Sequence, residues 1–502
     1  MRIPQRLPLR LGSYCSGEPA YSVFERLGAR SGTSARDLAR DYALKERSIR
    51  CGKLVETVAA LADLDTANLR AATLVLNARK VELNGALMER RLWDLDRRAH
   101  CPVCVQEDCE RQPELAYAGI IRRVWWDCKV VHACPIHRVR LETLRLELPK
   151  DLGNVARLND LGRREVDVSW EVYLVGRLGF GPKSESNVLD RMDINAVIIS
   201  VALFGWVSRF GKFEKFDFLF SFKDPETILA GFNILKSSDA LSRFLDRLWI
   251  EDKSYYKHAK CHSVYGELYR WYYYNNASPK SINKLSFIFI HESIREHALS
   301  RLPLGDDPKI FGELLSGRGL FPMPGHTKGR RAGDHEFFRT AVGLGLMDPG
   351  LAEIEWKKIG VSREVIEQVR TFQEATISGK ELAIRISAPW PVVSNLIRSG
   401  RLVPDLMVGR GAGRRLRFRS EVATKVLDRL VGTASVASTL VVGWGTITVA
   451  AATCGIQRSK LVQALFDGRI SASGRLCGID GFPGILVRIH EVEALASLES
   501  VR

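Results

Sequence analysis

The sequence has few cysteines, no long apolar segment and no strong compositional bias. Ten cysteines in 502 residues are too few for a disulfide scaffold. The longest strongly apolar run, residues 194–207, is shorter than the about 20 residues that a membrane-spanning helix needs. No apolar signal segment follows the basic amino terminus. The composition is 46% apolar and 26% charged, which excludes a mainly disordered or fibrous chain. We therefore expect a cytoplasmic protein with no membrane partner, in which thiols stay reduced.

Positive charge is concentrated at the two ends of the chain. Residues 1–150 and 374–502 each carry a net charge of +7, whereas residues 151–373 carry only +2. Such an excess favours a polyanionic partner such as nucleic acid, but scattered solvated charge explains it equally well. At roughly 100–200 residues per domain, the length predicts about three to five domains.

Two short blocks have the spacing of metal ligands. Cys101-Pro-Val-Cys104 and Cys134-Pro-Ile-His137 both read ligand, proline, β-branched residue, ligand. Structural zinc is held by four nitrogen or sulfur donors in a tetrahedron, and proline favours a tight turn that lets two nearby ligands reach one ion. We predict one structural Zn²⁺ held by Cys101, Cys104, Cys134 and His137, with no open position for a substrate water.

Other residues of this segment could compete for ligand positions or contact bases. Cys109, Cys128 and His132 lack a partner at the same short spacing, so we interpret them as packing or surface residues. Trp125 and Trp126 could stack on bases, but such residues more often fill the thin core of a small metal-bound domain. The H-x-E and P-C-x-x-C patterns of zinc deaminases are absent, which argues against a base-modifying enzyme.

These residues resemble the TniQ family of transposon target-site selectors, which work with a separate AAA+ ATPase. The resemblance rests on residues 100–108, on the Trp125-Trp126 pair and on residues 134–141. Residues 17–27 and 61–69 are similar to the family's first helix and second helical pair. The resemblance covers residues 5–150 and continues more loosely to about residue 320. Many members carry a second C-x2-C soon after the C-x2-H, but residues 144–152 have no cysteine.

The resemblance implies a non-enzymatic adaptor that recruits the AAA+ ATPase and, through it, the transposase. Some relatives instead dock as homodimers on an RNA-guided surveillance complex. Two other function classes remain as alternatives. One is a zinc-dependent nucleic-acid-modifying enzyme, and the other is a zinc-stabilised transcription regulator with no role in transposition.

Apolar periodicity predicts a mainly α fold. A capping residue at Ser34 and two helices joined at residues 63–65 predict a helical part over residues 1–99, before a zinc-finger part over 100–150. Such short helix pairs could form a helix-turn-helix, but neither helix concentrates a basic face, so we favour plain helical packing. In the middle domain, 151–372, Tyr265, Leu268, Tyr269 and Tyr272 recur at helical spacing, which indicates a core stripe.

Two other patterns of the middle domain are weaker. His258, Cys261 and His262 lack a fourth ligand, so they predict no second metal site. Residues 337–370 could form a helix-turn-helix in which Ser362 caps the second helix.

The carboxyl-terminal part aligns with itself at an offset of 68 residues. Ala383 matches Ala451, and residues 400–402 match residues 468–470. Each copy reads helix, turn, helix, glycine and extended segment. We predict two units at 373–432 and 440–502 that resemble winged helix-turn-helix domains of excisionase or MerR type. Five arginines between residues 410 and 419 predict a wing that faces phosphates.

The second helix of each unit is predicted to enter the major groove of double-stranded DNA. In the first unit the predicted DNA contacts are Trp390, Ser394, Asn395, Arg398, Arg410, Arg414, Arg415, Arg417 and Arg419. In the second unit they are Gln457, Arg458 and Lys460. Packing or protein docking is the alternative for both units. A DNA-targeting role predicts a cytoplasmic protein associated with the nucleoid.

Overall fold

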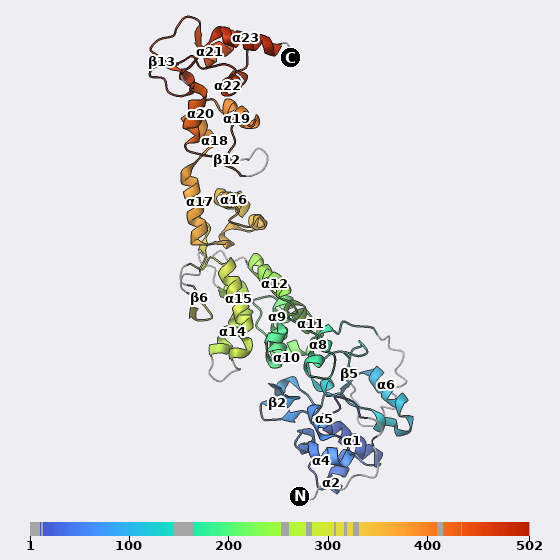
Figure 1. The fold of residues 1–502 in the computed structure, drawn as a ribbon. Coiled ribbons are helices and arrows are strands. Elements are labelled where there is room, and N and C mark those ends of the chain that lie inside the picture. Colours follow the sequence, from blue (N-terminus) through green and yellow to red (C-terminus); the bar gives the residue numbers. More distant parts are fainter. Residues whose placement is uncertain are drawn as a thin grey trace. The chain divides into compact units, whose positions relative to one another are not determined.

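A computed structural model describes most of the chain (Figure 1). The described residues are 11, 14–143, 164–252, 261–277, 284–305, 308–315, 319–324, 331–408, 415–432 and 434–500. The chain divides into two compact units, one formed by Met1–Ala298 with Lys309–Leu314 and the other by Leu299–Pro308 with Leu315–Arg502. Both are mainly helical, which confirms the predicted class.

The first unit begins with five short helices packed around one core. They are α1 (Ala20–Arg30), α2 (Ala35–Asp41), α3 (Glu46–Arg50), α4 (Val55–Ala62) and α5 (Thr66–Ala71). The Ser34 side chain accepts a hydrogen bond from the Asp37 amide at 3.1 Å and so caps α2, as the sequence predicts. Asp63 ends α4 in the left-handed conformation. The apolar faces of these helices bury Phe24 and Leu27 in their common core.

Short strands connect these helices to the segment with the two ligand blocks. The strands β1 (Val75–Leu76), β2 (Lys80–Leu83) and β3 (Ala86–Glu89) form an antiparallel sheet in that order. Next, β4 (Ala99–His100) pairs with β5 (Glu142–Thr143), and α6 (Pro102–Arg111) starts directly after β4. This pairing closes the ends of the segment, so both ligand blocks lie within one loop of chain.

The rest of the first unit is helical. It contains α8 (Ser169–Arg177), α9 (Ile194–Phe210), α10 (Phe218–Lys223), α11 (Pro225–Leu235), α12 (Ser238–Glu251), α13 (Cys261–Tyr265), α14 (Glu267–Ala277) and α15 (Ile288–Arg301), and the β6 (Lys309–Ile310) and β7 (Glu313–Leu314) hairpin. Tyr265, Leu268 and Tyr272 are buried, and Tyr269 stacks on Phe311 with 4.5 Å between ring centroids. The tyrosine-rich stripe therefore belongs to the core, as predicted.

The long apolar run of the sequence forms α9, which crosses α11 at a close contact between glycines. A Cβ atom on Gly205 would lie 1.8 Å from the Thr227 carbonyl oxygen, and one on Gly231 would lie 1.8 Å from the Val201 carbonyl oxygen. The two backbones can approach this closely only because both positions lack a side chain. The run is therefore a buried helix of the first unit.

The second unit begins with a small module that has its own core. It comprises β8 (Phe321–Pro322), α16 (Glu336–Gly343), β9 (Gly360–Val361) and α17 (Arg363–Ala375), with β8 and β9 antiparallel. Its core contains Met323, Phe338 and Ile359. Ser362 caps α17 as predicted. The helix-turn-helix considered for residues 337–370 is wrong, because 3₁₀ turns and β9 separate α16 from α17, where that motif has a turn of about 3–4 residues.

The carboxyl-terminal part contains the same order of elements twice. The first copy is β10 (Thr376–Ser378), α18 (Gly379–Arg385), α19 (Trp390–Arg398), β11 (Leu406–Val408), β12 (Arg415–Arg419) and α20 (Val422–Val431). The second is β14 (Trp444–Thr446), α21 (Ile447–Thr453), α22 (Arg458–Phe466), β15 (Gly474–Leu476), β16 (Ile485–Arg488) and α23 (Ile489–Ser500). The sheet orders are β10-β12-β11 and β13-β15-β16-β14, where β13 (Ser435–Ala437) is an added parallel strand.

The two copies share one hydrophobic core. It contains Leu396 and Phe418 from the first copy and Leu465 and Ile485 from the second. Each copy thus covers apolar surface of the other, and residues 376–500 form one folded body.

None of the helices that the structure describes combines the length and the apolar character of a membrane span.

Candidate functional site

The two predicted ligand blocks meet in the first unit. Cys101 is the capping residue of α6, Pro102 is the first residue of that helix, and the Cys104 amide donates to the Cys101 Sγ at 3.4 Å. The other block is a tight turn closed by a hydrogen bond from the Arg138 amide to the Cys134 carbonyl at 2.9 Å. Each block therefore presents its two donors from one turn of backbone.

The donor atoms lie at the separations that one zinc ion requires. His137 Nδ1 is 3.5 Å from Cys101 Sγ, 3.3 Å from Cys104 Sγ and 3.7 Å from Cys134 Sγ, and the sulfurs of Cys104 and Cys134 are 3.7 Å apart. Zinc bond lengths of about 2.3 Å to sulfur and 2.0–2.1 Å to nitrogen give tetrahedral edges of about 3.6–3.8 Å. These four side chains could thus hold one metal ion, which is consistent with zinc.

The surroundings of the donors fit a closed, structural metal site. The three cysteines are buried. Hydrogen bonds from the Cys101 and Cys104 thiols lower the pKa of Cys134, which favours the thiolate form that binds metal. The Nε2 atom of His137 lies 3.0 Å from the Glu107 carboxylate, which orients the ring so that Nδ1 points to the sulfurs. Sequence reasoning missed Glu107, although it lies one helical turn after Cys104.

The three competing residues lie outside this cluster. Cys128 is buried, and burial raises the pKa of its thiol to about 12. Cys109 is half-buried on α6. Burial of the His132 side chain lowers the pKa of its ring to about 4. None of the three belongs to the donor cluster found among the described residues.

Two buried ion pairs stabilise this part of the chain, one within the segment between the ligand blocks and one at the start of α1. Asp108 on α6 binds Arg123 through both carboxylate oxygens, at 2.6 and 3.1 Å, with side-chain exposures of 0% and 5%. Glu18 and Arg26 form a second such pair at 2.8 Å. Removing Asp108 would leave the buried Arg123 guanidinium without the carboxylate that it binds.

The two tryptophans between the ligand blocks are packing residues, as predicted. They lie in the 3₁₀ turn η3 (Val124–Asp127), where Trp125 and Trp126 are 3% and 0% exposed. The Trp125 ring packs against Gly17, whose φ of +91° suits glycine. The Arg123 guanidinium lies 4.9 Å from the Trp126 ring centroid. Neither ring is free to stack on a base.

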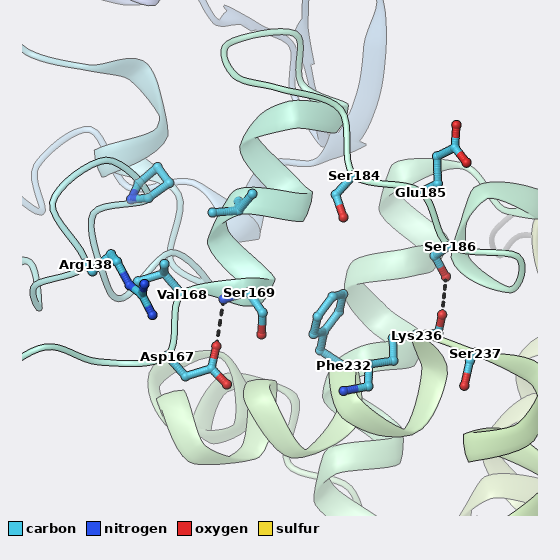
Figure 2. A pocket seen from close by; sticks show the side chains of 12 residues that line it. Arg138, Asp167, Val168, Ser169, Ser184, Glu185, Ser186, Phe232, Lys236 and Ser237 are labelled. Carbon is cyan, nitrogen blue, oxygen red and sulfur yellow. Dashed lines mark hydrogen bonds between the residues drawn. The ribbon is translucent and has the colours of Figure 1, made fainter.

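A cavity of about 660 Å³ opens beside the second ligand block (Figure 2). Arg138 and Asp167 lie on one side of it, and Lys236 and Glu185 on the other. The Ser186 hydroxyl donates to the Lys236 carbonyl at 3.0 Å, which joins two of its walls. The lining carries both signs of charge, so it selects no one class of ligand and we assign it none.

In the carboxyl-terminal body, the two predicted recognition helices pack against each other. Gln463 of α22 donates to the Asn395 side chain of α19 at 2.8 Å, and these residues occupy the same position in the two copies. Arg401 binds Asp467 at 2.6 and 2.7 Å beside them. The α19 face that carries Asn395 is therefore directed to α22 rather than to solvent.

The remaining helix residues differ in exposure. Trp390 is 40% exposed, Arg398 is exposed and Ser394 is half-buried. Gln457, Arg458 and Lys460, at the start of α22, are exposed. The loop between β15 and β16, which stands where the second wing would be, packs onto the first copy, because the Phe482 amide donates to the Ile386 carbonyl at 2.8 Å and Phe482 is buried.

The arginines of the predicted wing have acidic partners. Arg415 and Arg417 both bind the Glu336 carboxylate of α16, and Arg419 lies 3.3 Å from the Asp405 carboxylate. Arg410 and Arg414 lie outside the described residues, as does His258 of the weak cysteine and histidine pattern. Sequence reasoning missed Glu336, because it lies 79 residues before Arg415 and outside the repeat.

Comparison with known proteins identifies the part of the chain that holds the metal cluster. Residues 9–141 match the TniQ family. The match contains all four candidate donors, the amino-terminal helices and both buried ion pairs. No curated protein matches the chain. The chain therefore carries a TniQ domain at residues 9–141, as the resemblance of its sequence motifs predicts.

Proposed function

We propose that this protein is a DNA-binding targeting adaptor of a transposon. It selects the insertion site and recruits the AAA+ ATPase regulator, which brings the transposase. The observation that carries this proposal is the TniQ domain at residues 9–141. In this proposal that domain is the docking part for the ATPase, and the carboxyl-terminal body is the DNA-binding part. The protein would work in the cytoplasm, on the nucleoid.

The metal site has a structural role in this proposal. Cys101, Cys104, Cys134 and His137 would hold one Zn²⁺, and four protein donors complete a tetrahedral sphere. The ion would cross-link the start of α6 to the turn at residues 134–137. Because the donors come from both ends of the loop, metal binding and folding of the loop are coupled. This arrangement supports an adaptor over a zinc enzyme, which keeps a position for water or substrate.

DNA recognition is assigned to the exposed parts of the carboxyl-terminal body. Trp390 and Arg398 of α19 and the start of α22, with Gln457, Arg458 and Lys460, are exposed. We keep Arg410 and Arg414 as phosphate contacts, since they lie in sequence between β11 and β12. Asn395 is assigned to the contact with α22 instead of base recognition, because its side chain already binds Gln463.

Recovery of bound DNA from cells, followed by sequencing, tests the proposal. One recurring sequence motif is expected, because the chain has its own candidate DNA-binding body. Sites that match guide RNAs would instead assign targeting to an RNA-guided surveillance complex, with this protein as its adaptor. DNA recovery no greater than that of an Arg398→Ala/Arg458→Ala variant would refute direct recognition.

Recruitment of the ATPase needs a separate test, because the two activities are assigned to different parts of the chain. A purified AAA+ ATPase encoded beside this protein should bind the wild type. The double variant Arg398→Ala/Arg458→Ala should bind the ATPase equally well. The Cys104→Ser variant should not, since the metal bound by the cysteine–histidine site would hold the TniQ domain together. Equal binding by all of these proteins would refute the assignment of docking to the TniQ domain.

A further inference from the structure

The arginines of β12 form one face of a strand. Arg415, Arg417 and Arg419 alternate with Leu416 and Phe418, and Phe418 is fully buried in the carboxyl-terminal core. Because successive side chains of a strand point to opposite faces, the three arginines lie on the face away from that core. β12 is the central strand of its sheet, between β10 and β11.

Each arginine of this face contacts an acidic side chain in the structure. The two oxygens of Glu336 bind different arginines, Oε2 with Arg415 and Oε1 with Arg417. The side chain of Arg417 is only 15% exposed in this contact, whereas that of Arg415 is 52% exposed. The Asp405 carboxylate forms an ion pair with the Arg419 side chain and also accepts a hydrogen bond from the Arg419 backbone amide at 2.8 Å.

We propose that the contact of Glu336 with Arg415 and Arg417 is autoinhibitory, and that DNA phosphates compete with Glu336 for these two arginines. The inference rests on the proposed DNA-binding function and adds a regulatory step to it. A carboxylate and a phosphate both offer oxygen pairs that match the planar guanidinium group, so one anion can replace the other. Binding through β12 would then require that α16 move away.

The construction of the second unit is compatible with such a movement. The module of α16 has its own core around Phe338 and Ile359, which is distinct from the core of residues 377–495. At the carboxyl end of α16, Gly343 packs against the Leu406 side chain. Release of α16 from the sheet would therefore break two ion pairs and the packing of α16 against β11, while each of the two cores keeps its own residues.

Binding of the full-length protein to a 30-base-pair duplex of mixed sequence, at 50 and 200 mM salt, tests the proposal. The variant is Glu336→Gln. The matched control is Glu353→Gln, which has the same charge change in the same module but removes a contact with Arg331, away from β12. Two arginines released to phosphates should steepen the salt dependence by about two in log–log slope. The affinity gain should therefore be about tenfold larger at 50 mM than at 200 mM salt.

A second substitution tests whether the gain comes from the released arginines. Arg415→Gln should have little effect on DNA binding in the wild type, where Glu336 already holds that side chain. In the Glu336→Gln background it should remove about half of the added salt slope. Additive effects of the two substitutions would overturn the proposal.

The remaining outcomes separate this inference from the proposed function. Equal affinity and salt slope for Glu336→Gln and Glu353→Gln, with the wild type still binding DNA, would overturn autoinhibition and leave the proposed function intact. Failure of all the proteins to bind the duplex, with unchanged circular dichroism, would overturn both.

Discussion

Breaking the buried pair of Asp108 and Arg123 should destabilise the TniQ domain more than breaking an exposed ion pair. Asp108 binds Arg123 with both oxygens and also accepts the Ile121 amide at 3.0 Å. In Asp108→Ala the Arg123 charge and the Ile121 amide would stay buried and lose these partners. Removing one member of a buried pair costs about 3–5 kcal/mol. The guanidinium keeps its contact with the Trp126 ring, so we expect the lower end, about 3 kcal/mol.

Native-state hydrogen exchange of the α6 amides measures this loss locally. A decrease of about 3 kcal/mol corresponds to roughly a hundredfold faster exchange through opening of the domain. Glu56→Ala is the control, because it removes an ion pair with Arg70 in which both side chains are more than half exposed. Such exposed pairs contribute about 0–1 kcal/mol, so exchange in the control should change little.

A double variant tests the physical reason for the loss. Asp108→Ala combined with Arg123→Met removes both charges, so it should be less destabilised than the sum of the single variants. Less than tenfold faster exchange in Asp108→Ala, or strictly additive losses in the double variant, would refute the reasoning.

Three further perturbations follow from other parts of the structure. Removal of metal by a chelator, or Cys104→Ser, should unfold residues 14–143 and leave the hydrogen exchange of residues 376–500 unchanged; equal loss in both regions would contradict a local structural ion. Gly205→Ala should lower stability by about 3 kcal/mol, since its Cβ would lie 1.8 Å from a carbonyl oxygen. Gly181→Ala, with no atom nearer than 3.7 Å, is its control in thermal unfolding. A chain that ends at residue 432 should lose protection in α19, because the second copy completes its core; native protection there would disprove the shared core.

The metal cluster could be predicted from sequence because each half of it is local. Cys101 and Cys104 lie three residues apart, as do Cys134 and His137, so each pair is positioned by one turn of backbone whatever the rest of the chain does. The contact of Glu107 with the His137 ring is partly local too, because Glu107 lies one helical turn after Cys104. The buried partner of Asp108 could not be predicted, because Arg98, Arg111 and Arg122 are nearer to it in sequence and only packing selects Arg123.

The repeat shows the same division. Equivalent residues at an offset of 68 predicted two similar sets of elements, and glycines at Gly400 and Gly468 end α19 and α22 with φ values of +71° and +72°. The sequence repeat does not predict which surfaces of the two copies contact each other. The sequence therefore predicted two separate recognition helices, whereas the structure packs α19 against α22 through Asn395 and Gln463.

The sequence by itself determined the helical class, the cluster of four candidate metal donors and the internal repeat, since these depend on residue spacing over one or two turns. Tertiary structure alone decided which charges are available. From sequence, Arg415 and Arg417 are predicted to form a solvent-facing basic wing. In the structure both bind Glu336 of α16, which is about 80 residues away in sequence. A charged side chain carries no local signal of its partner, because ion pairs form wherever packing brings opposite charges together.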